Sequence, residues 1–194
     1  MQKINNYILI TPAPIEPITL DEVKQKLRLI GNNDFDTELT RLIVVAREMC
    51  ENATGRDLIN KTYRGFLDSY CKVAEFRKSK LQSIISVKYY KDNVLTTFTD
   101  YYSTNEYDYS KLIFKSNFTH DDRLQAIEIE FIAGYGATAN SIPTSLKEGM
   151  LAMVDWLFNN SGDCTTEASI MANSLFGNYV IGKKIFFTIW NVNQ

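Results

Sequence analysis

Residues 17–58 read PITLDEVKQKLRLIGNNDFDTELTRLIVVAREMCENATGRDL, and this stretch predicts two consecutive helices. Thr19 and Glu22 have the spacing of a capping box, in which each side chain accepts a hydrogen bond from the other residue's backbone N–H. Apolar residues then recur every three or four positions, which is typical of helices with one buried face. Gly31 and Gly55 are natural ends, because glycine accepts the left-handed backbone of a helix C-terminus. We therefore expect an α-helical hairpin here.

Residues 127–160 read IEIEFIAGYGATANSIPTSLKEGMLAMVDWLFNN and predict a strand, a tight turn and a third helix. Apolar and acidic residues alternate from Ile127 to Phe131, as in a strand with one buried face. The GYG sequence that follows permits a sharp exit from the strand. Pro143 suits the first turn of a helix, where its missing N–H costs nothing.

The segment between these two stretches has the composition of β-strands. Ile84–Tyr90 and Leu95–Thr99 are rich in β-branched and aromatic residues and flank Lys91-Asp92-Asn93, which predicts a β-hairpin. Ahead of the first helix, three prolines in residues 12–17 indicate an extended arm.

This order of elements predicts one α+β domain over residues 1–194. A helical hairpin (19–58) and C-terminal helices (142–176) would pack as a small helical bundle. An antiparallel β region (61–133) would be inserted between them, and residues 177–194 would form a tail, a candidate docking arm.

Composition excludes several classes of protein. The 21 basic and 23 acidic residues give a net charge of −2, which does not suit a general nucleic-acid binder that neutralises many phosphates. The three cysteines are odd in number and far apart, so neither a disulfide framework nor a zinc site is expected. We see neither a signal peptide nor a stretch long and apolar enough to span a bilayer, so no membrane partner is expected.

Candidates for catalysis are few. His120 is the single histidine and lies in the polar sequence FTHDDR, away from any candidate nucleophile. Together with Asp121 and Asp122 it could bind a metal, although a solvated loop is the interpretation we prefer. The GYG turn lacks the further residues of a phosphate-binding loop. We expect no enzyme activity, no catalytic or metal site and no cofactor.

Two groups of residues indicate partners instead. A basic group, interleaved with tyrosines, could contact nucleic acid or could be the solvated face of a hairpin. Its members are Lys72, Arg77, Lys78, Lys80, Lys88 and Lys91. The second group is an apolar and basic tail, which either returns as an extra strand on the sheet or docks on another chain. Its members are Phe176, Tyr179, Lys183, Lys184, Phe186, Phe187 and Trp190.

The ordered combination of these segments resembles one family. PITLDEVKQKLRL, REMCENATGRDL, LQSIISVKYY and FIAGYG followed by IPTSLKEGMLAMVDWLFNN are similar to the head–tail connector proteins of long-tailed bacteriophages, prophages and gene-transfer agents. These are also called adaptor or head-completion proteins. The resemblance covers most of the chain, and none of its motifs is catalytic.

The resemblance implies a structural role in the virion neck, after assembly in the host cytoplasm. Family members form a ring, commonly dodecameric, beneath the portal protein; the ring extends the DNA channel, completes the head and binds the next neck or tail-completion protein. DNA would pass through without sequence-specific binding. Their C-terminal segment reaches into the portal, a role that falls here on the tail residues named above. The tail is longer and more aromatic than the family's usual ending, and Lys183 and Lys184 could replace its arginine.

The basic group would then lie at a subunit interface or along the DNA channel. Two alternatives remain. One is a nucleic-acid-binding module that uses the Lys/Arg/Tyr hairpin, and the other is a tail-terminator or another neighbouring ring of the neck.

Overall fold

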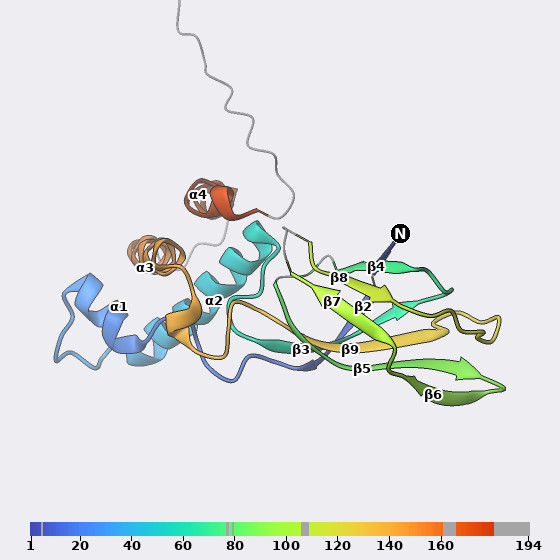
Figure 1. The fold of residues 1–194 in the computed structure, drawn as a ribbon. Helices are drawn as coiled ribbons and strands as arrows, with labels where there is room; N and C mark the ends of the chain where they lie inside the picture. Colours follow the sequence, from blue (N-terminus) through green and yellow to red (C-terminus); the bar gives the residue numbers. More distant parts are fainter. Residues whose placement is uncertain (5, 77, 79, 106–108, 161–165, 181–194) are drawn as a thin grey trace, which may run out of the picture.

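Helices gather at one end of the molecule and strands at the other, as Figure 1 shows. The structure is a computed structural model, and it describes residues 1–4, 6–76, 78, 80–105, 109–160 and 166–180. The described residues form four α-helices, nine strands in two sheets and two short 3-10 helices. The mixed α and β content predicted from the sequence is confirmed. No helix among the described residues is long and apolar enough to cross a membrane.

Helix α1 (Leu20–Leu27) begins with the predicted capping box. The Glu22 N–H donates to Thr19 Oγ1 at 3.2 Å, and the Thr19 N–H donates to Glu22 Oε2 at 2.7 Å. The helix ends before Gly31, where we expected its end. Arg28 takes the left-handed conformation (φ 59°), and its N–H bonds back to carbonyls of the last turn.

The other helices pack with α1 around a common apolar core. Helix α2 (Asp36–Thr54) ends at Gly55, which has a φ of 69° as the prediction requires. It contacts both α3 (Thr144–Asn159) and α4 (Thr166–Phe176), and α1 contacts α3. The 3-10 helices are Ala139–Ser141 and Gly177–Tyr179. Fully buried side chains of this core include Leu39, Leu42, Ala46, Leu146, Met150, Met153 and Leu157.

The larger sheet has the strand order β2-β3-β9-β5-β6, and every neighbouring pair is antiparallel. Its strands are β2 (Asn6–Thr11), β3 (Lys61–Leu67), β9 (Ile127–Ala133), β5 (Leu81–Lys91) and β6 (Val94–Phe98). The smaller sheet has the order β1-β4-β8-β7, in which β1 runs parallel to β4. Its strands are β1 (Gln2–Ile4), β4 (Val73–Phe76), β8 (Lys111–Phe114) and β7 (Tyr101–Thr104).

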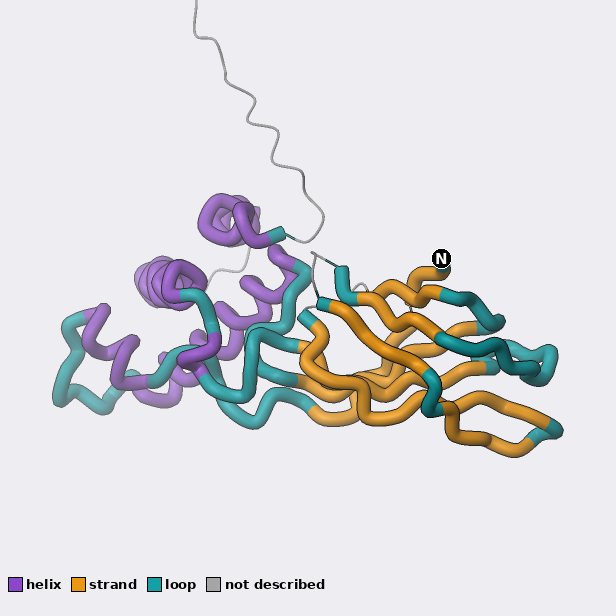
Figure 2. The backbone as a smooth tube through the Cα atoms, viewed as in Figure 1, coloured by secondary structure: helices purple, strands orange, loops and turns teal. Residues whose placement is uncertain are grey.

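The two sheets form the two layers visible in Figure 2 and enclose a second apolar core. Aromatic rings bridge the layers, with the Phe76 and Phe131 ring centroids 4.6 Å apart. Phe131 also stacks on Tyr63 at 5.9 Å and meets the edge of Tyr7 at 5.8 Å. Phe131 thus contacts a ring from the opposite sheet and two rings from its own.

Several details of the β region differ from the prediction. The segment before the prolines is not an extended arm, because residues 2–4 form β1 and residues 6–11 form β2, one strand in each sheet. The β region therefore needs the N-terminus as well as residues 61–133. Strand β7 was not predicted either, because its tyrosines stand in a polar stretch without the alternation that indicates a half-buried strand.

The predicted β5–β6 hairpin is confirmed, and a distant loop holds its tip. Asp92 and Asn93 both have positive φ angles, 53° and 63°, as in the tightest hairpin turns. The two carboxylate oxygens of Asp121 accept their backbone N–H groups, each at 2.8 Å. The loop between β8 and β9 is thereby fastened to the hairpin.

Replacing Phe131 by alanine should lower the free energy of unfolding by about 3–5 kcal/mol, because it opens a cavity where the two sheets meet. Leu124 is 78% exposed, so Leu124→Ala is a matched control that should change this free energy by less than about 0.5 kcal/mol. Denaturant titration followed by far-UV circular dichroism measures both values. Equal unfolding midpoints for the two variants would contradict the proposed packing.

Candidate assembly site at the helix–sheet junction

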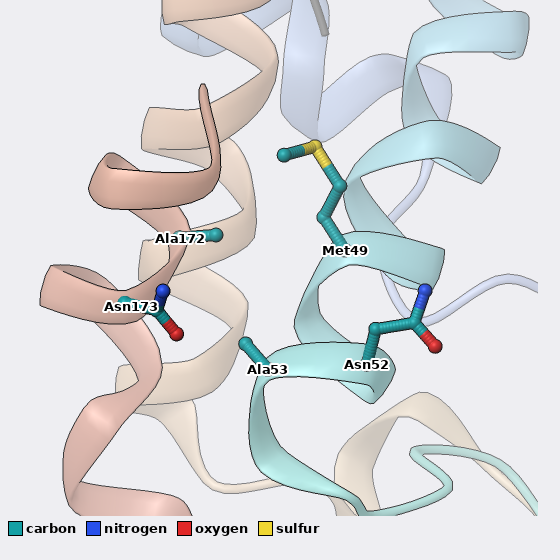
Figure 3. A pocket seen from close by; sticks show the side chains of 5 residues that line it. All are labelled: Met49, Asn52, Ala53, Ala172 and Asn173. Atoms are coloured by element: carbon teal, nitrogen blue, oxygen red, sulfur yellow. The ribbon is translucent and has the colours of Figure 1, made fainter. Parts of the chain in front are cut away.

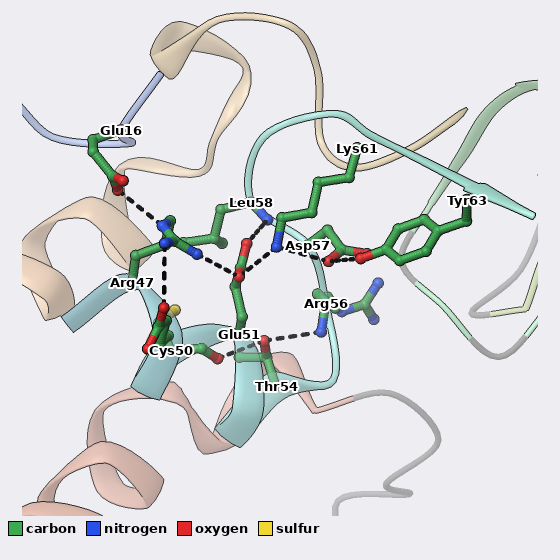
Figure 4. Close-up of polar contacts among 11 residues, drawn as sticks. Glu16, Arg47, Cys50, Glu51, Thr54, Arg56, Asp57, Leu58, Lys61 and Tyr63 are labelled. Carbon is green, nitrogen blue, oxygen red and sulfur yellow. Dashed lines mark hydrogen bonds and ion pairs between the residues drawn. The ribbon is translucent and has the colours of Figure 1, made fainter. Parts of the chain in front are cut away.

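A cluster of charged side chains joins the helical end to the larger sheet, as Figure 4 shows. Glu51, near the end of α2, accepts hydrogen bonds from Arg47 Nη1 at 3.0 Å and from Lys61 Nζ, on β3, at 2.6 Å. Its other oxygen accepts the Leu58 N–H at 3.1 Å. Arg47 also donates to Glu16, which precedes α1, at 2.9 Å. One carboxylate therefore holds a helix, a loop and a strand in place.

Asp57 extends this cluster toward the core between the sheets. Its Oδ1 accepts the Tyr63 hydroxyl at 2.8 Å and lies 3.2 Å from Lys61 Nζ. Burial raises the pKa of Tyr63, and the Asp57 charge and hydrogen bond raise it further. Burial alone would lower the pKa of Arg47, but the charges of Glu16 and Glu51 outweigh it and raise that pKa. Tyr63 stays neutral and Arg47 stays charged near pH 7, so the cluster acts as a fixed connection.

The root of the C-terminal tail lies beside the same junction. Arg56 Nε donates to the Tyr179 carbonyl oxygen at 2.7 Å, and the Tyr179 hydroxyl is hydrogen-bonded to Ser145 Oγ on α3. Val180 is the last residue that the structure describes. At the tail root, the chain is therefore held by one side chain from the loop after α2 and by one from α3.

Phe176 belongs to this root and not to a docking surface, which corrects its predicted role. Its side chain is fully buried, and a Cβ added at Gly149 on α3 would lie 2.7 Å from its ring. The glycine thus allows α4 to pack closely on α3. The predicted docking residues of the tail beyond Val180 all lie outside the described residues; they are Lys183, Lys184, Phe186, Phe187 and Trp190.

The basic residues singled out in the sequence do not form one patch. Lys80 precedes β5 and Lys91 ends it, and a strand of 11 residues is about 35 Å long. Lys72 precedes β4 in the other sheet, and Arg77 lies outside the described residues. Lys88 has Glu128 as its cross-strand partner, which offsets its charge.

Two of these lysines lie instead at the junction. Lys78 Nζ is 5.0 Å from the centre of the Tyr63 ring, and Lys80 Nζ is 5.6 Å from that of Tyr135. Lys78 lines an open pocket of about 270 Å³ together with Glu51, Asn52, Gly55, Arg56, Asp57, Lys61 and Tyr63. Its lining includes two acidic side chains, Glu51 and Asp57, and three basic ones, so this pocket carries little net charge.

A shallow groove of about 230 Å³ runs between α2 and α4, shown in Figure 3. Its lining residues are Met49, Asn52, Ala53, Ala172 and Asn173. They include two amides but no charged or nucleophilic side chain. The groove suits contact with a protein segment better than it suits chemistry.

The loop considered for metal binding is used structurally. His120 Nε2 accepts the Tyr70 N–H at 3.0 Å, and its Nδ1 lies 2.8 Å from the Asp121 carbonyl oxygen. The Asp121 carboxylate holds the hairpin tip, as described above. Within the described ranges, no group of three His, Cys, Asp or Glu side chains is placed to hold a metal ion.

Comparison with known proteins identifies similar folds but no related sequence. No family model matches the chain. No curated protein matches it either. A chain in the neck of an empty gene transfer agent (GTA) particle, computed with sixfold symmetry, is similar over 92% of this chain and 96% of its own, with a TM-score of 0.75 and 15% identity.

Two further solved structures contain chains with a similar fold. A chain in the virion of a native GTA particle covers 91% of this chain and 96% of its own, with a TM-score of 0.71 and 16% identity. A chain in the neck of a native GTA particle, computed with twelvefold symmetry, covers 92% and 96%, with a TM-score of 0.64 and 12% identity. The resemblance stated from the sequence is thus confirmed for the fold, over nearly the whole chain.

Sequence reasoning did not find the Glu51 cluster, although a signal was present. Arg47 and Glu51 are four residues apart, as are Asp57 and Lys61, and the two pairs flank the Gly55 turn. Pairs at this spacing are common on exposed helices and contribute little there. Only the fold shows that these two pairs meet and are largely withdrawn from water.

Replacing Glu51 by glutamine should lower the free energy of unfolding by about 3 kcal/mol, because Arg47 and Lys61 would lose the carboxylate between them. Glu48 also pairs with Arg47, at 3.5 Å, but its side chain is 60% exposed. Glu48→Gln is therefore the matched control and should cost less than about 1 kcal/mol. Chemical denaturation of both variants measures the difference; similar losses would show that the buried cluster adds nothing special.

Proposed function

We propose that this protein is a structural subunit of the neck of a tailed phage or gene-transfer-agent particle. Copies of the chain form a ring, dodecameric in the completed particle, beneath the portal protein. The ring completes the DNA-filled head, extends the DNA channel and binds the next neck or tail-completion protein. It assembles in the cytoplasm of the bacterial host and catalyses no reaction.

The observation that carries this proposal is the similarity to neck chains over 92% of the sequence. Because the similarity includes both the helical end and the two sheets, it is not a match to one common substructure. Two of the similar chains come from necks computed with sixfold and twelvefold symmetry, which supports a ring. At identities of 12–16%, the similarity supports the role through the fold, and binding to the portal tests it directly.

The geometry of the tail root fits a docking arm. Arg56, Ser145 and the buried Phe176 hold the chain up to Tyr179, so a partner that binds the tail would be held at a defined place on the subunit. In the proposed ring this partner is the portal, and Lys183 and Lys184 supply the basic contact. The shallow groove between α2 and α4 is a second surface without chemistry of its own.

The alternative of a nucleic-acid-binding module has less support. Such a module needs basic and aromatic side chains along one track. Of the basic residues singled out in the sequence, Lys80 and Lys91 lie at opposite ends of β5, and Lys72 precedes β4 on the other sheet. A tail-terminator or another neighbouring ring of the neck stays as the second candidate. Binding to the portal distinguishes it from the proposed position.

The first measurement is co-sedimentation of the purified protein with the portal ring encoded beside it. We expect stoichiometric binding, near one copy per portal subunit, because each portal subunit would receive one tail. Binding to double-stranded DNA of random sequence, measured in parallel, should be weak. An absence of portal binding at micromolar concentrations would contradict the portal-proximal position and favour another layer of the neck.

Deleting residues 181–194 should abolish portal binding and leave the fold intact, because the truncated chain keeps Phe176 and Tyr179 in place. The melting temperature and the co-sedimented fraction measure the two effects. A full-length variant with Lys183→Ala and Lys184→Ala isolates the basic contribution and should weaken binding in a salt-dependent way. If the truncated chain unfolds, the tail is part of the folded core.

A further inference from the structure

Strand β2 is an edge strand that exposes apolar side chains on both of its faces. Ile8, Leu9 and Ile10 are 53%, 47% and 42% exposed. Neighbouring residues of a strand point to opposite faces of the sheet, so a partner that lay on one face could not cover both Ile8 and Leu9. A strand added alongside β2 would cover both, because its own side chains project to both faces.

The opposite edge of the same sheet has the same property. Val94 and Leu95 are adjacent in β6, and they are 63% and 37% exposed. In the described part of the chain, no strand pairs with the outer side of β2 or of β6. The larger sheet thus ends in two edges that each expose at least one apolar side chain on either face.

Register shows which of these side chains share a face. Residues paired across antiparallel strands project to the same face, as do residues two positions apart. The pairs Ile8–Arg64 and Arg64–Glu130 connect β2 to β9, and the pairs Leu95–Tyr90 and Lys88–Glu128 connect β6 to β9. Ile8 and Leu95 therefore project to one face. Leu9, which pairs with the buried Tyr63, and Val94 project to the other.

Most of each edge lacks the usual protection against pairing. Natural sheets guard free edges with charged side chains, prolines or bulges. Residues 4–15 and 94–99 contain no charged residue. In β2 the protection is confined to its end, where a bulge lies between Leu9 and Thr11 and Pro12 follows. The part of β2 before the bulge is open to another strand.

We propose that β2 of one copy pairs with β6 of the next copy, so that the larger sheets of neighbouring subunits join edge to edge. The two edges match in apolar character, in the absence of charge and in length. They are different surfaces of one chain, which is what a head-to-tail interface requires. This inference deepens the proposed function by naming the contact between ring subunits, but its test does not require the portal.

The direction of pairing follows from the topology. Four pairs of neighbouring strands separate β2 from β6 across the sheet, and all four are antiparallel. The two edge strands therefore run in the same direction. Head-to-tail repetition around a many-fold axis preserves that direction and gives a parallel β2–β6 contact. Pairing of β2 with β2 would instead be antiparallel, related by a twofold axis, and would close as a dimer.

Disulfide trapping tests the contact. In a background with Cys71→Ser and Cys164→Ser, the double variant Ile8→Cys/Leu95→Cys places one thiol at each edge on the same face. Ile8→Cys/Thr97→Cys samples the next register, because Thr97 lies two residues further along β6 on that face. Oxidation at about millimolar protein should give a ladder of disulfide-linked dimers, trimers and larger species on non-reducing gels, since each copy offers two different edges.

Three controls show whether a ladder comes from β2–β6 pairing. Leu9→Cys/Leu95→Cys places the thiols on opposite faces and should give no ladder. Leu124→Cys, an exposed site outside every strand, reports cross-linking by random collision. Ile8→Cys alone should form no more dimer than this collision control; abundant dimer with no ladder in the double variants would overturn the proposal in favour of β2–β2 pairing.

The cysteine variants are oxidised both as free protein and, where they bind the portal, in that complex. The two results distinguish failure of the edge contact from failure of the proposed function. A ladder without portal binding supports the edge contact and contradicts the position beneath the portal. Portal binding without a ladder, in the free protein and in the complex, overturns the edge contact alone.

Discussion

The arrangement of this molecule depends on one largely buried carboxylate, that of Glu51. Glu51 connects Arg47 of the same helix, Lys61 of β3 and the backbone of the intervening loop, while Arg47 reaches back to the segment before α1. Removing charges from water costs several kcal/mol for each ion, so this cluster is favourable only while every partner is in position. That requirement fixes how the helical end and the sheets meet. The molecule has two separate apolar cores, one among the helices and one between the sheets, and this cluster lies where the two parts meet.

Local chemistry made the helical end predictable, and long-range pairing made the sheets less so. The Thr19 capping box, the Gly55 end of α2 and the Asp92-Asn93 turn are signals within a few residues, and the structure contains all three. The strands at residues 2–11 were missed because their partners lie some sixty residues away in the sequence. A short apolar run near three prolines is ambiguous until those partners are known. Arg28 ended α1 early for a similar reason, since propensity alone does not place a left-handed residue there.

The candidate site could be predicted only in part. The sequence indicated binding surfaces and no catalytic site. The described residues contain a small pocket of mixed charge at the helix–sheet junction and a shallow groove between α2 and α4. The basic residues near β5 are not a single patch, because the length of the strand separates residues that lie close together in the sequence. Phe176 was assigned to the tail by composition alone, whereas the glycine opposite it on α3 shows that it belongs to the core. Edge exposure, the basis of the proposed subunit contact, becomes visible only once strand order is known.

The Arg56–Tyr179 hydrogen bond has a consequence for the strength of assembly. A fixed root means that, in a symmetric ring, the starting points of all tails lie on one circle at regular intervals. In the proposed complex with the portal, once the first tail has bound, the others are already opposite their own sites, and their binding becomes effectively intramolecular. Individual contacts can then be weak and reversible while the ring as a whole holds firmly. Such avidity favours complete rings over partial ones and lets a misplaced subunit leave before the circle closes.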